Sequence, residues 1–130
     1  MKRVTGIGGI FFKCKDPKST KAWYGKHLGF PMDDYGCTFK WRELDKPDSA
    51  PPAQTVWSPF KEDSNYFAPS EKPYMFNYRV ENLVELLEVL KAEGVEIVGE
   101  MQEYPYGKFG WILDPDGNKI ELWEPKEDGF

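Results

Sequence analysis

The sequence GKFGWILDPDGNKIEL at residues 107–122 predicts a β-hairpin. Both arms, residues 108–113 and 118–123, are rich in apolar and aromatic side chains. Between them lies DPDG at residues 114–117, a combination typical of a tight turn. The aspartates of this segment superficially suggest a calcium loop, but the segment is too short and contains a proline, so the hairpin is favoured.

A strand followed by a helix is predicted at the start of the chain. Residues 4–14 form an apolar stretch that indicates a strand. Asp16 is a suitable N-cap, and Pro17 fits the first helical position. The helix is expected to run to about Leu28, where Gly29 ends it.

The same order of elements returns in the second half. Tyr74–Val80 indicates a strand, Asn82 and Glu85 fit the start of a helix, and Gly94 fits its end. Both Asp16 to Gly29 and Glu81 to Gly94 span 13 residues, and the two pairs are offset by 65 in a chain of 130. The spacing indicates an internal repeat of strand-helix-strand-strand-strand.

The predicted domain is single and built from two modules. Strands are expected at residues 31–35, 37–44 and 53–60 in module 1–60, and at 95–98 before the hairpin in module 74–130. Six of the 11 prolines lie between residues 45 and 73, so residues 61–73 are assigned to a linker.

Composition excludes several partners and sites. A net charge of −5 and a pI near 5.0 argue against nucleic acid as a partner. No apolar run approaches the ~18 residues of a membrane helix, and no signal peptide is recognised. Cys14 and Cys37 form no C-x-x-C pair, which favours reduced thiols and a cytoplasmic location. The only histidine, His27, cannot supply a metal site with two or more histidines.

These motifs resemble the vicinal oxygen chelate superfamily, which includes glyoxalase I, bleomycin-resistance proteins and extradiol dioxygenases. The resemblance is carried by Asp16, Trp23-Tyr24 and Leu28-Gly29-Phe30, and by the segment at residues 107–122 quoted above. It implies an α+β fold in which two βαβββ modules form curled mixed sheets around a central cavity. It also implies a homodimer.

Metal enzymes of that superfamily place a histidine on the first strand and a glutamate on the last strand of each module. On the spacing implied by the resemblance, the first histidine position holds Gly9, and the second holds Met75, or Tyr74 if the register slips by one. The first glutamate position falls near Val56 or Trp57. Only the last position is kept, as Glu121. We therefore expect no metal and no cofactor, since one carboxylate is a poor site for a divalent ion.

Strand alternation predicts which side chains face the cavity. If Gly9 and Met75 face the cavity, the residues two and four positions further along each strand face it as well. Tryptophan side chains are expected to add aromatic walls. The predicted ligand-binding residues are Phe11, Lys13, Trp57, Met75, Asn77, Arg79, Trp111, Glu121 and Trp123.

Glu121 is the only catalytic candidate, and its role has two interpretations. It either anchors a cationic or hydroxyl group of a ligand, or it forms a buried ion pair with Lys13 or Arg79. A general base needs a raised pKa, which a nearby cation would oppose. The segment at 104–107 is either a lid over the cavity or a tight turn.

The leading hypothesis is a metal-free protein that binds an aromatic or amphipathic small molecule between its modules. The excess of aromatic residues, 16% of the chain, supports this hypothesis. One alternative is a lyase, isomerase or dioxygenase that uses Glu121 with atypical ligands. The other is a dimerisation module without a ligand.

Overall fold

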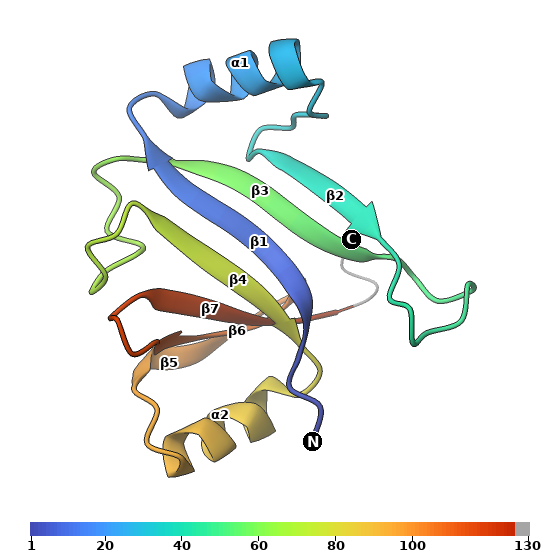
Figure 1. Ribbon diagram of the computed structural model, residues 1–130, viewed down its shortest axis with the longest axis vertical. Coiled ribbons are helices and arrows are strands. Elements are labelled where there is room, and N and C mark those ends of the chain that lie inside the picture. The colour runs from blue at the N-terminus through green and yellow to red at the C-terminus, as the bar shows by residue number, and fades with distance from the viewer. Residues whose placement is uncertain (127–130) are drawn as a thin grey trace.

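The computed structural model describes residues 1–126. It contains a single sheet of seven strands in the order β2-β3-β1-β4-β7-β6-β5, with two helices. Figure 1 shows the helices at opposite ends of this sheet, with β1 and β4 side by side between them. The elements are β1 (Val4–Cys14), α1 (Pro17–Leu28), β2 (Cys37–Trp41), β3 (Ala53–Lys61), β4 (Tyr74–Val80), α2 (Leu83–Ala92), β5 (Ile97–Tyr104), β6 (Gly107–Leu113) and β7 (Lys119–Pro125).

The α+β fold class is confirmed, and the two halves of the chain meet in the middle of the sheet. The first strands of the halves, β1 and β4, pair antiparallel. Each also pairs in parallel with the last strand of its own half, β1 with β3 and β4 with β7. The first strands of both modules therefore lie at the centre, and the sheet is mixed.

Both helices begin and end as their sequences predict. The Asp16 carboxylate accepts from the backbone N–H of Lys18 at 3.1 Å, and Gly29 ends α1 with a φ of 70°. In α2, the side chain of Asn82 accepts from the backbone N–H of Glu85 at 3.1 Å. The apolar side of α2 buries Leu83 and Leu86, which pack with residues of β4 and β7.

The short strand expected at residues 31–35 does not form. Pro31 has no backbone N–H to give to a neighbouring strand. The following segment is a turn in which the Asp33 carboxylate accepts from the backbone N–H groups of Tyr35 and Gly36 at 2.8 and 2.9 Å. The first half of the chain therefore contributes three strands to the sheet, and the second half contributes four.

Two other boundaries differ from the sequence prediction. β2 ends at Trp41, short of the expected residue 44, whereas β5 extends to Tyr104, well beyond the expected residue 98. The segment at 104–107 is a tight turn, since Tyr104 pairs with Gly107 across β5 and β6. Within residues 1–126, neither helix has the length and apolar character that crossing a membrane requires.

Candidate functional site

A row of paired residues crosses the middle of the sheet. Strand register places Val56 of β3 beside Gly9 of β1, and Gly9 beside Asn77 of β4. The row continues from Asn77 to Glu121 of β7, and from Glu121 to Trp111 of β6. Glu121 is 3% exposed and Asn77 is 2% exposed, so the polar part of the row is buried.

The Glu121 carboxylate accepts hydrogen bonds from three side chains. The amide Nδ2 of Asn77 donates to Oε1 at 2.6 Å, and the indole Nε1 of Trp111 donates to Oε2 at 2.9 Å. The hydroxyl of Tyr66 also donates to Oε2. These partners occupy three of the roughly four acceptor positions of a carboxylate.

Tyr66 belongs to the segment between the modules, and sequence analysis did not include it in the site. Its backbone carbonyl accepts from Nζ of Lys119 at 2.7 Å. Tyr66 is therefore bonded to β7 through both its carbonyl and its hydroxyl. Burial raises the pKa of the Tyr66 phenol far above its ordinary value, and the charge of Glu121 and its hydrogen bond raise it further. The hydroxyl therefore remains a donor. Periodicity gave no signal for this residue, because it lies outside every strand and helix.

Lys119 lies close to this cluster without bonding to Glu121. Its Nζ is 5.3 Å from the centre of the Tyr66 ring and 5.6 Å from that of Trp111. Burial lowers the pKa of Lys119, while the charge of Glu121 acts in the opposite direction. The lysine is held by a carbonyl and two aromatic rings.

A cavity of about 590 Å³ lies over the row. Its floor includes Gly8, Asn77 and Glu121, and its walls include Phe11, Val56, Phe109 and Trp123. The lining is completed by residues of the turn at 33–36, by the first two residues of β2, and by Tyr106 from the β5–β6 turn. Phe109 and Trp123 stack with their ring centres 5.9 Å apart, which gives that wall a flat aromatic surface.

The ligand-binding residues expected from the sequence divide into three groups. Phe11, Asn77, Glu121 and Trp123 line the cavity, and Trp111 supports Glu121. Met75 and Lys13 lie beyond it, since Met75 packs in a core cluster with Phe11 and Phe67, and Nζ of Lys13 is 5.5 Å from the Phe67 ring centre.

Trp57 and Arg79 occupy other parts of the molecule. Trp57 packs against Phe12, Tyr24 and Phe30, which places it on the sheet face that α1 covers. The guanidinium of Arg79 lies 5.3 Å from the Trp123 ring centre and 5.9 Å from that of Trp41. Neither lines the cavity.

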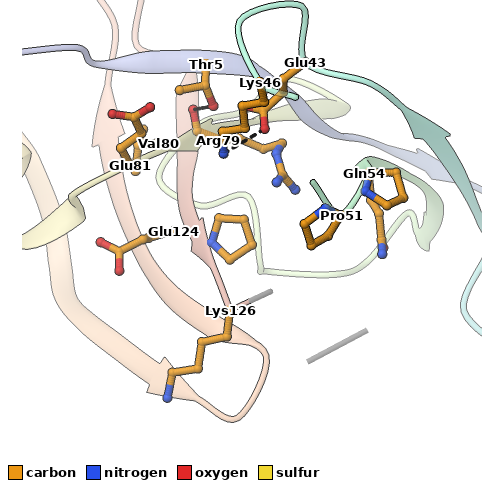
Figure 2. A pocket seen from close by; sticks show the side chains of 12 residues that line it. Thr5, Glu43, Lys46, Pro51, Gln54, Arg79, Val80, Glu81, Glu124 and Lys126 are labelled. Atoms are coloured by element: carbon orange, nitrogen blue, oxygen red, sulfur yellow. Dashed lines mark hydrogen bonds and ion pairs between the residues drawn. The ribbon is translucent and has the colours of Figure 1, made fainter. Parts of the chain in front are cut away.

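Arg79 instead lines a second, smaller pocket of about 230 Å³. Figure 2 shows this pocket, with Arg79 among side chains of both charges that include Glu43, Lys46 and Glu124. The ion pair considered from the sequence, Glu121 with Lys13 or Arg79, is therefore replaced by the three hydrogen bonds described above.

A family model for the glyoxalase/bleomycin resistance protein/dioxygenase superfamily matches residues 6–122. The chain belongs to this superfamily. No curated protein sequence matches it significantly. Among solved structures, methylmalonyl-CoA epimerase from Mycobacterium tuberculosis is 19% identical, with a TM-score of 0.65, and the match covers 96% of this chain and 91% of the other.

Two further superfamily structures share the fold. A variant of Streptomyces coelicolor methylmalonyl-CoA epimerase in complex with 2-nitronate-propionyl-CoA is 15% identical, with a TM-score of 0.67 and coverage of 94% and 98%. The Mn(II)-bound glyoxalase from Novosphingobium aromaticivorans is 19% identical, with a TM-score of 0.61, and the match covers 95% of this chain and 40% of the other. These identities are low, so the structural similarities establish the fold alone.

The metal-binding chemistry known in the superfamily does not fit the residues of the row. Val56 is apolar, Gly9 has no side chain, and Asn77 turns its amide nitrogen toward Glu121. Asn77 is the residue of β4 beside Glu121, and Met75 lies two residues away on the same strand. Within residues 1–126, no three His, Cys, Asp or Glu side chains are grouped to hold a metal ion. One carboxylate with three donors is a poor match for a divalent cation.

Proposed function

We propose that this superfamily member binds an aromatic or amphipathic small molecule in the cavity over Asn77 and Glu121, without a metal ion. The observation that carries the proposal is the form of the cavity, with a small polar floor inside aromatic walls. Its volume of about 590 Å³ lies within the range of small-molecule sites, roughly 300–1,000 Å³.

The preorganisation of Glu121 supports binding rather than metal chemistry. Asn77, Trp111 and Tyr66 fix both carboxylate oxygens before any ligand arrives. Binding to an acceptor that is already fixed costs less conformational entropy than binding to a side chain that the ligand must first order. Binding and sequestration are therefore the activity that this geometry favours.

The experiment is a thermal-shift and native mass spectrometry screen against a library of aromatic and amphipathic compounds. Hits are titrated in buffer containing EDTA, using tryptophan fluorescence because Trp123 lines the cavity. We expect saturable one-to-one binding that EDTA does not change. Binding that appears only after a divalent metal is added would contradict the proposal and favour a metal-dependent lyase, isomerase or dioxygenase.

Two substitutions on β2 supply a matched test of location. Thr38 lines the cavity, whereas the exposed Lys40 does not. Thr38→Trp should block the cavity and abolish binding of a hit, while Lys40→Trp should leave it unchanged. Equal loss in both variants, or in neither, would place the ligand elsewhere. A screen in which no compound binds would favour the alternative that the protein is a dimerisation module without a ligand.

We also propose that the chain forms a homodimer. Ile10 of β1 and Phe76 of β4 pair across the centre of the sheet, and they are 38% and 42% exposed. Phe12 and Val80 are on the same face by strand alternation, and they pack toward α1 and α2 respectively. The central apolar strip between the helices is thus uncovered in one chain. A second copy placed by a two-fold axis would cover it with the same strip.

A further inference from the structure

The charged residues that line the cavity are all acidic. They are Asp33, from the turn after α1, and Glu121, from β7. No lysine, arginine or histidine within residues 1–126 belongs to the lining. The electrostatic potential inside a cavity with one sign of charge and apolar walls is reinforced by the low dielectric of those walls.

The floor also presents hydrogen-bond acceptors in excess of donors. Asn77 uses its amide nitrogen for Glu121, and its Oδ1 lies against Gly8 of β1. That oxygen is buried and has no hydrogen-bond partner among the described residues. Because this oxygen has almost no accessible surface, the Glu121 carboxylate is the acceptor of the floor that a ligand would meet.

The three cations nearest to the floor, Lys13, Arg79 and Lys119, do not line the cavity. Nζ of Lys119 donates to the carbonyl of Tyr66 and lies over aromatic rings outside the lining. Lys13 lies over Phe67, and Arg79 lines the second pocket. The negative charge of the floor therefore faces the space that a ligand would fill.

From this arrangement, and resting on the ligand-binding function proposed above, we infer that the cavity selects cationic ligands: compounds with a protonated amine attached to a flat apolar body. The amine would donate toward Glu121. The flat body would lie against Phe109 and Trp123, whose parallel rings suit an aromatic partner. Aromatic faces also attract the positive charge itself.

Three probes with the same ring system test the inference. Naphthalen-2-ylmethylamine is cationic at pH 7, naphthalen-2-ylmethanol is neutral, and 2-naphthoate is anionic. We expect the amine to bind at least about tenfold more tightly than the alcohol, and the carboxylate more weakly than either, because a desolvated charge pair is worth at least ~1.4 kcal/mol. Equal affinity of the amine and the alcohol, or preference for the carboxylate, would overturn the inference.

Two variants link the preference to the acidic residues. Glu121→Gln should bring the affinity of the amine to within about threefold of the alcohol, because it removes the charge at nearly constant volume. Asp33→Asn retains a side-chain acceptor for the turn. It therefore keeps the test available if Glu121→Gln does not fold. We expect Asp33→Asn to reduce the preference for the amine over the alcohol by a smaller factor than Glu121→Gln does. An unchanged preference in every variant that folds would overturn the inference.

Failure of the inference can be distinguished from failure of the proposed function. If the library yields a cavity ligand while the three naphthalene probes bind equally or not at all, selection for cations is wrong and the binding function stands. If the library and the probes both show no binding, both are wrong.

Discussion

Asn77 and Glu121 are neighbours on the parallel strands β4 and β7, and the Asn77 amide donates to the Glu121 carboxylate at 2.6 Å. In metal enzymes of the superfamily, a histidine and a glutamate hold the ligand positions in this part of the second module. In this protein, Asn77 and Glu121 form a hydrogen bond with each other. In this place in the fold, the Glu121 carboxylate accepts three hydrogen bonds from side chains of the chain itself.

The hydrogen-bond network around Glu121 should contribute to stability. Glu121→Ala leaves three donors without their acceptor, so we expect the free energy of unfolding to fall by at least about 2 kcal/mol in urea denaturation. Glu103→Ala is the control, because its exposed ion pair with Lys126, at 3.7 Å, should contribute less than about 1 kcal/mol. Equal losses of unfolding free energy in the two variants would contradict a stabilising role for the network.

The raised pKa of Tyr66 predicts a loss of stability at alkaline pH. The fold favours the neutral phenol, so its contribution is complete below pH 10.0, the ordinary pKa, and is lost as the pH rises above that value. The unfolding free energy of the native protein should thus fall more steeply between pH 9 and 11 than that of Tyr66→Phe. Parallel curves for the two proteins in a chemical denaturation series would contradict the role given to Tyr66.

The close approach of Asn77 to β1 requires glycine at position 8. A Cβ added to Gly8 would lie 2.2 Å from Oδ1 of Asn77, so Gly8→Ala must displace the amide. We expect lower stability and weaker ligand binding. Gly25→Ala in α1 is a suitable control, since its nearest contact would be 3.6 Å and alanine favours a helix by about 0.5–1 kcal/mol. A Gly8→Ala protein as stable as the control and equally active in binding would show that the amide can move freely.

The proposed homodimer predicts the effect of a charge on the central strip. Ile10→Lys should convert the dimer into a monomer in multi-angle light scattering at micromolar concentration, because it would bury an unpaired charge. Val84→Lys on α2, which is 44% exposed, should leave the dimer intact. A native protein that is already monomeric would overturn this proposal.

The sequence predicted the elements that depend on local residues. Asp16, Gly29 and Asn82 act within a few residues of themselves, so the helix boundaries were predictable. The turn at 114–117 was equally clear, and Glu121 was identified through its motif. The strand at residues 31–35 was predicted wrongly, because hydrogen bonds from the backbone N–H groups of Tyr35 and Gly36 to the Asp33 carboxylate compete with strand pairing.

The rest of the site depends on contacts between distant segments. Tyr66 reaches Glu121 from a segment 55 residues away in sequence, and no periodic pattern marks such a contact. Trp57 is on a strand that flanks the cavity, but its side chain points to the helix-covered face. Its aromatic character alone did not distinguish the two faces. Arg79 was expected in the cavity, yet Trp41 and Trp123 hold it against the second pocket.

We propose that the cavity binds an organic molecule where superfamily enzymes bind a metal. A crystal structure of the protein with a hit from the screen, recorded with anomalous diffraction at the metal absorption edges, tests it most directly. We expect density for the compound against Phe109 and Trp123, with a polar atom within hydrogen-bond distance of Glu121 and no anomalous peak. An anomalous peak bonded to Glu121, with Asn77 or Tyr66 turned away from the carboxylate, would contradict it.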